Sequence, residues 1–250
     1  STAVVFLLFV LVLFRKRSPI RISLKERFSF ERTCLSAVWR LGLPVALERA
    51  TVSVAQIIIT AVITGIGTTA VAANHLAVTA ESISYLPAYG VAGAATTLVG
   101  QAVGAGRKDL AKRFARLVTW IGILVMTFGG LLLFCLAPQL IRIFTSESEV
   151  VALGTQVLRI VAFAEPLFGA SIVASGALRG DGDSKGPFFI SLATMWGVRI
   201  TLSFLLAGSL GLNGVWLAMA AELCVRGLIF MVRLYRGRWL NIDLFQTKKS

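Results

Sequence analysis

The chain has 250 residues, of which 56% are hydrophobic and 15% are charged, and its formal net charge is +13. Its mean hydropathy of +0.82 is higher than a soluble domain needs. Such a charge raises the question of nucleic-acid binding. The basic residues sit beside apolar runs, however, so membrane topology explains them, and no nucleic-acid partner is predicted.

The lysines and arginines divide the polar breaks between apolar runs into two kinds. Of the 25 basic residues, 21 fall in four breaks, at residues 15–40, 107–116, 179–185 and 226–249. The alternate breaks together hold only Arg142 and lie at residues 65–71, 138–149 and 208–214. Because short basic loops stay cytoplasmic, we expect these loops and the C-terminus inside the cell, next to anionic lipid headgroups. The predicted location is the plasma (inner) membrane of a bacterium.

The apolar runs predict the elements in chain order. Residues 1–14 are too short to span and are interpreted as the end of a preceding helix, followed by a basic cytoplasmic linker at 15–39. Six full spans follow, at residues 40–64, 72–101, 112–134, 150–177, 187–207 and 213–233. Residues 236–250 form a cytoplasmic tail. The predicted fold class is therefore all-α: a polytopic membrane protein with a six-helix transmembrane domain at residues 40–235.

Three prolines lie inside or near the ends of these spans: Pro44, Pro87 and Pro166. Each removes a backbone donor and tends to kink its helix. Bent helices at membrane depth are tolerated where they are buried in protein or line a cavity. Transporters use such breaks both for packing and for gating, and both interpretations remain open for these prolines.

Four carboxylates also fall within the spans, and charged groups at that depth usually face a bundle interior or a water-filled path. They are Glu48, Glu81, Glu165 and Glu222. Glu222 precedes Arg226 by four residues, so we expect the two side chains to pair on one helix face. The other three are candidates for a functional site.

Glu48 lies one turn after Pro44, and Gln56 lies two turns further along roughly the same face. A carboxylate beside a kink, with an amide beyond it, suits a bound cation or proton. The alternative is an ion pair with Arg49 or with another basic group near the cytoplasmic surface.

Glu165 and Glu81 lead to similar alternatives. Glu165 either pairs with Arg199 on the next span or takes part in a gate, and such a pair could serve both purposes. Glu81 lies near mid-span, just before Ser84 and Tyr85, and is expected to join an interior polar network.

Nothing in the sequence indicates catalysis. His75 is the only histidine and has no second metal ligand nearby, and no Ser/His/Asp or Cys/His set is present. We therefore predict a protein that is not an enzyme and needs no cofactor. The predicted ion is a coupling ion, a proton or sodium, and sodium would bind at Glu48 or Glu165.

Several stretches, in order and on the expected spans, resemble the multidrug and toxic compound extrusion (MATE) family. They are RLGLPVALERATVSVAQ (40–56), AANHLAVTAESISYLPAYGVAGAATTLVGQAVGAGR (72–107), EPLFGASIVASGALRGDGDSKGP (165–187) and MWGVRITLSFLLA (195–207). The resemblance extends from about residue 40 to residue 235 and corresponds to the second of the family's two six-helix lobes. Pro44 and Glu48 match a proline and an acid of the seventh helix, and Glu165 matches an acidic position of the tenth, each acid about one turn from its place in some members.

The resemblance implies half of a twelve-helix secondary antiporter that works by alternating access. Such a protein exports organic, often cationic, compounds in exchange for sodium or protons, and its missing partner would be an N-terminal six-helix lobe. Within this frame Glu48, Gln56, Glu81, Glu165 and Arg199 are the candidate ion-coupling or substrate residues. Two alternatives remain: a lipid-linked oligosaccharide flippase of the same superfamily, and a half-length membrane partner protein that transports nothing.

Overall fold

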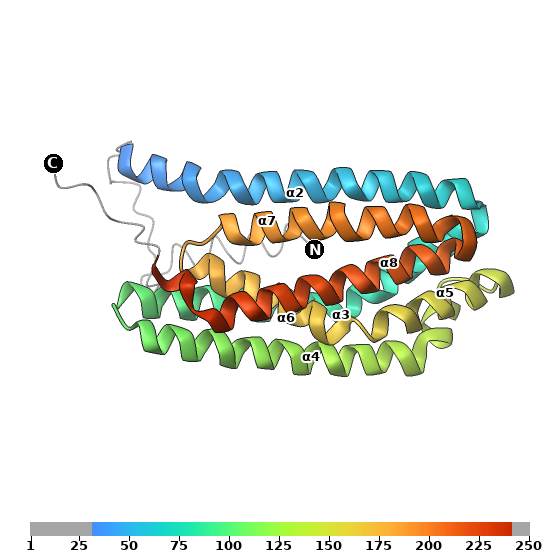
Figure 1. Ribbon diagram of the computed structural model, residues 1–250. Coiled ribbons are helices and arrows are strands. Elements are labelled where there is room, and N and C mark those ends of the chain that lie inside the picture. Colours follow the sequence, from blue (N-terminus) through green and yellow to red (C-terminus); the bar gives the residue numbers. More distant parts are fainter. Residues whose placement is uncertain (1–31, 242–250) are drawn as a thin grey trace, which may run out of the picture. The chain divides into compact units, whose positions relative to one another are not determined.

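The computed structural model describes residues 32–241, and within this range it contains helices and no strand (Figure 1). In chain order the elements are α2 (Arg32–Ile66), α3 (Thr68–Gly104), α4 (Lys108–Arg142), α5 (Ser148–Ala162), α6 (Glu165–Gly180), α7 (Lys185–Thr194), the π-helical segment η1 (Met195–Ile200), α8 (Thr201–Arg236) and the 3-10 turn η2 (Arg238–Asn241). Of the described residues, those from 38 to 241 belong to one compact unit, and the contacts below lie within it. The predicted helix end at 1–14, most of the linker and the end of the tail lie outside the described residues.

The six predicted spans correspond to helices. The first three are α2, α3 and α4, although α2 already begins at Arg32, before the predicted start at residue 40. The last two form one continuous helical run, α7–η1–α8, which turns back at Gly211 (Figure 1). Gly211 has φ 56°, a left-handed conformation that glycine adopts without steric cost.

Apolar length supports membrane insertion for most of this bundle. Within residues 32–241, three helical stretches are long and apolar enough to cross a membrane: Leu41–Ile66, Lys108–Arg142 and Lys185–Arg236. The pair α5 and α6 passes the same test as one broken span with a bend of 58°. α3 is long enough but is not among these stretches, and it carries Asn74, His75 and Glu81.

Pro166 accounts for the bend between α5 and α6. The sequence predicts one span at 150–177, whereas the structure has two helices with a break at Phe163–Ala164. Pro166 stands in the first turn of α6, where its missing N–H would be unpaired in any case. Pro44 and Pro87 lie inside the uninterrupted helices α2 and α3. Of the three prolines, one therefore marks a break in a span.

The packed part of the bundle is formed by α3, α4 and α6, which contact one another (Figure 1). α3 presents a row of buried alanines: Ala73, Ala77, Ala80, Ala88, Ala92 and Ala95. At Gly176 of α6, a Cβ atom would lie 2.6 Å from the carbonyl oxygen of Ala92. Small residues let helix backbones approach this closely in membranes, where apolar lipid gives helices little hydrophobic reason to associate.

Candidate functional site

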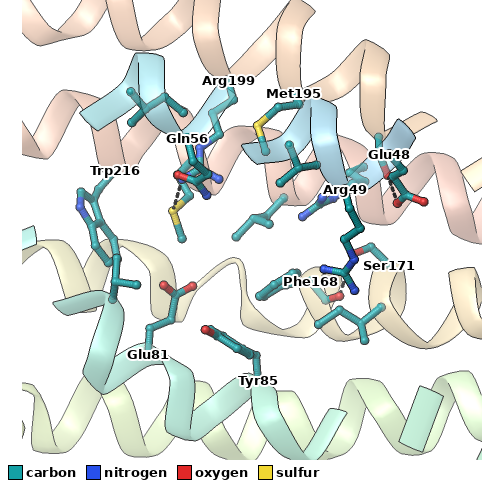
Figure 2. A pocket seen from close by; sticks show the side chains of 18 of the residues that line it. Glu48, Arg49, Gln56, Glu81, Tyr85, Phe168, Ser171, Met195, Arg199 and Trp216 are labelled. Atoms are coloured by element: carbon teal, nitrogen blue, oxygen red, sulfur yellow. Dashed lines mark hydrogen bonds between the residues drawn. The ribbon is translucent and has the colours of Figure 1, made fainter. Parts of the chain in front are cut away.

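A cavity of about 400 Å³ lies among α2, α3, α6, α7, η1 and α8 (Figure 2). Its ionisable lining residues are Glu48, Arg49, His75, Glu81, Arg179, Arg199 and Arg226. Its aromatic lining residues are Tyr85, Tyr89, Phe168, Trp216 and Phe230. A concave site of this size, with an apolar wall and a few converging polar groups, is the usual form of a small-molecule site.

The helix α2 brings Glu48, Arg49 and Gln56 to the cavity. Glu48 accepts hydrogen bonds from Arg179 of α6, at 2.7 Å, and from the hydroxyl of Ser191 in α7, at 3.0 Å. Its basic partner is therefore Arg179 and not Arg49. Arg49 reaches separately into the cavity (Figure 2) and makes no ion pair with any described residue.

Glu165 and Glu81 lie in different surroundings, although each is within electrostatic range of the other. Glu165 is fully buried at the start of α6, outside the cavity lining, and accepts a hydrogen bond from Ser84 of α3 at 2.8 Å. The alternative pairing of Glu165 with Arg199 does not form, because the break before α6 directs Glu165 toward α3. Glu81 lines the cavity (Figure 2) and makes no hydrogen bond or ion pair with the described residues.

Arg199 stands on the π-helical segment η1, and such segments are frequent at functional sites. Its side chain is only 9% exposed. Its Nη2 atom lies 3.0 Å from the sulfur of Met219, and its Nε atom has no hydrogen-bond partner in the described part of the chain. The carboxylates of Glu222 and Glu81 are close enough to attract its charge, but neither forms an ion pair with it.

The predicted helical pair of Glu222 and Arg226 is present, with Nε and Oε1 3.3 Å apart. Glu222 is fully buried and also accepts a hydrogen bond from Thr194 at 2.8 Å. Arg226 lies over the ring of Phe168, with its Cζ atom 5.6 Å from the ring centroid. Glu222 thus has a cationic partner on its own helix and is not among the residues that line the cavity.

Sequence reasoning missed Arg179 and Ser191 as cavity residues. Arg179 was assigned to a basic cytoplasmic break, yet it stands in the last turn of α6. Its long side chain reaches Glu48 across 131 positions of sequence. No local spacing pattern signals such a contact, because it depends on how α2 and α6 are oriented.

The loop after α6 holds two further buried acids, Asp181 and Asp183. Asp183 forms an ion pair with Arg233 of α8 and accepts a hydrogen bond from the Gly186 N–H at 2.9 Å. Burial, and secondarily the charge of Asp183, raises the pKa of Asp181 from 3.8 to about 7, against the opposing effect of Lys108. Asp181 is therefore a titratable group that lies outside the cavity lining.

Comparison with known proteins identifies the sequence family. The MatE family model matches residues 44–205. The chain is 27% identical over 224 residues to the probable multidrug resistance protein NorM of Thermotoga maritima, covering 86% of this chain and 48% of that protein. It is 32% identical over 211 residues to the probable NorM of Brucella suis, covering 81% and 44%. The chain thus spans about half the length of the curated relatives it matches.

Solved structures show the same fold. A MATE protein in complex with MaL6 aligns with a TM-score of 0.83 at 22% identity, covering 94% of this chain and 54% of that one. An outward-facing multidrug resistance MATE transporter of the MOP superfamily aligns with a TM-score of 0.83 at 21% identity, with the same two coverages. Here too the chain corresponds to about half of each structure.

Proposed function

We propose a transport function from one premise: this chain belongs to the MATE family. It supplies one six-helix lobe of a secondary antiporter that exports organic compounds in exchange for sodium or protons. The observation that carries the proposal is the cavity, which gathers ionisable side chains from five helical elements, α2, α3, α6, η1 and α8, at membrane depth. Such residues are costly there and mark ion or substrate paths.

The coupling ion would bind at Glu81 and Glu165. The two carboxyl groups are within electrostatic range of each other, and neither has an ion pair among the described residues. Two negative charges at membrane depth repel each other and lack water, so a proton or a sodium ion taken up by the pair relieves both costs. Glu48 already has Arg179 as a partner, so it would act in coupling only when that ion pair opens.

Alternating access requires a second lobe. In transporters built from repeats, one lobe rocks against the other around a shared site near the bilayer midplane. The cavity in this chain is one wall of such a site. The proposed orientation places the basic loops and the C-terminus in the cytoplasm of a bacterial cell, since 21 of the 25 basic residues lie on that side.

Efflux from cells tests the proposal. Cells carrying the transporter that contains this lobe would be loaded with ethidium, a cation, or with fluorescein, an anion. Dye export would then be compared with the proton or sodium gradient present and with that gradient removed. Glu81→Gln keeps the side-chain shape and removes the charge, so we expect it to abolish ion-driven export of whichever dye is a substrate. Glu149→Gln, an exposed position at the start of α5, is the matched control.

Two results would contradict the proposal. Gradient-independent movement of both dyes in the wild type would argue against an antiporter. Export by Glu81→Gln at the wild-type rate, at matched expression, would remove Glu81 from the coupling site and leave the Glu48–Arg179 pair as the next candidate.

A further inference from the structure

We propose that this cavity binds an anionic group of an organic ligand, a carboxylate, sulfonate or phosphate, with Arg199 as the main contact and Arg49 as the second. This inference rests on the proposed transport function and specifies its substrate class. It departs from the cationic substrate that the family resemblance favours, and the reason is the charge of the cavity wall.

Arg199 has unused hydrogen-bonding capacity. A guanidinium carries five N–H donors, yet the one hydrogen bond that Arg199 makes with a described residue goes to the sulfur of Met219, which is a weak acceptor. Its buried Nε has no hydrogen-bond partner within residues 32–241. Burying unpaired donors is costly, and a carboxylate or phosphate satisfies two of them together in a bidentate geometry.

The ionisable lining residues carry a positive surplus. Four of them are arginines and two are glutamates, namely Arg49, Arg179, Arg199, Arg226, Glu48 and Glu81. The charge of Arg179 is matched by Glu48, and that of Arg226 by the buried Glu222. Arg49 and Arg199 then remain without an ion pair among the described residues, and Glu81 is the one lining carboxylate that is left to balance them. An anionic ligand balances this surplus, whereas a cationic ligand increases it.

The rest of the wall suits an organic body attached to the anionic group. Tyr85, Phe168 and Trp216 line the same space (Figure 2), and aromatic rings contribute large apolar contact areas with defined geometry.

The membrane potential also favours the export of an anionic ligand. An inside-negative membrane potential drives an anion outward by about 2.3 kcal/mol per charge at 100 mV.

Two xanthene dyes of opposite charge test the site without any transport. The whole chain would be purified into phosphatidylcholine nanodiscs, and binding of fluorescein, an anion, and rhodamine 6G, a cation, measured by fluorescence anisotropy. We expect fluorescein to bind at least about tenfold more tightly than rhodamine 6G, which corresponds to 1.4 kcal/mol. Equal affinities, or a preference for rhodamine 6G, would overturn the proposal.

Substitutions locate the contact. Arg199→Met should lower fluorescein affinity at least about tenfold, while the affinity for rhodamine 6G stays the same or rises. Arg199→Lys should lower fluorescein affinity by a smaller factor, because lysine keeps the charge but lacks the planar guanidinium that binds an anion with two hydrogen bonds. Arg49→Gln, at an exposed position, should weaken fluorescein by a smaller factor and keeps the test valid if Arg199→Met does not fold. Arg113→Gln, exposed on α4 and outside the cavity lining, is the control.

The site would be refuted if Arg199→Met lowered the affinity for both dyes to the same degree and Arg49→Gln changed neither affinity. That pattern would mean that Arg199 has a structural role and does not contact the ligand. Adding phosphatidylglycerol to the nanodiscs separates two sources of the anionic group. Competition with fluorescein would assign the site to a lipid headgroup, and no competition would assign it to a soluble organic anion. Because binding is measured without a gradient, failed ion-driven export leaves this result standing, and failed binding leaves the export assay standing.

Discussion

The two faces of α6 are built in opposite ways. One face carries Gly176 and Gly180, where an added Cβ would lie 2.6 and 2.5 Å from carbonyl oxygens of α3. The other face carries Phe168, Ser175 and Arg179, which line the cavity. One side of this helix therefore packs closely against a neighbouring backbone, and the other side presents polar side chains to the cavity. Rigid packing on the first face allows the second to keep charges that would otherwise be too costly.

The largest effect is expected on the cavity side, at Arg226, which lies over Phe168. Arg226→Met leaves the fully buried Glu222 without its cation, so we expect the free energy of unfolding to fall by about 3–5 kcal/mol. Reversible denaturation in mixed micelles would measure the loss. Replacing Glu222 and Arg226 together by methionine should restore most of it. A double variant no more stable than Arg226→Met would show that the ion pair is not the cause.

The next effect concerns the packed face. Gly176→Ala places a methyl group against the backbone of α3, and overpacking of this kind costs about 1–3 kcal/mol. Gly93→Ala is the matched control, because Gly93 lies on α3 with open space where its Cβ would be. The melting temperatures of the two purified variants would be compared. Equal melting temperatures would mean that the close approach of α3 and α6 does not constrain the bundle.

The end of α6 should respond to pH, unlike its packed face. The pKa of Asp181 is raised from 3.8 to about 7, so the folded state holds a proton that the unfolded state releases. The free energy of unfolding should then fall as pH rises from about 4 to about 7, by at most about 1.4 kcal/mol per pH unit. Asp181→Asn should flatten this dependence, and Asp109→Asn, at an exposed position, should not. Identical pH profiles for Asp181→Asn and the wild type would contradict the assignment.

The smallest effect is expected at Thr96, whose hydroxyl donates across the packed face to the carbonyl oxygen of Gly176 at 2.8 Å. Hydrogen bonds between transmembrane helices contribute about 0.6 kcal/mol on average. Thr96→Val keeps the side-chain shape and should cost about that much in denaturation measurements. Ser175→Ala removes only a bond within α6, to the carbonyl oxygen of Ile172, and should cost less. If Thr96→Val lowered the free energy of unfolding more than Gly176→Ala, the hydrogen bond would be more important on this face than the close backbone packing.

The sequence by itself determined the fold class, the six helices and the family. These follow from the length of the apolar runs, the alternation of basic breaks and the order of motifs, all of which are local along the chain. It also determined the pair of Glu222 and Arg226, because residues four apart on a helix are neighbours whatever surrounds them. Pro166 was recognised as a kink, but the 58° bend and the division of that span into α5 and α6 were not.

Only the tertiary structure decided which charges meet. Glu48 was an open choice between a free site and a pair with a nearby basic group, and its partner proved to be Arg179, from another helix. Glu165 was placed beside Ser84 instead of Arg199. These outcomes depend on the rotation of each helix about its axis and on how closely the backbones approach. Periodicity within one helix shows which residues share a face, but it does not encode which face of another helix lies opposite.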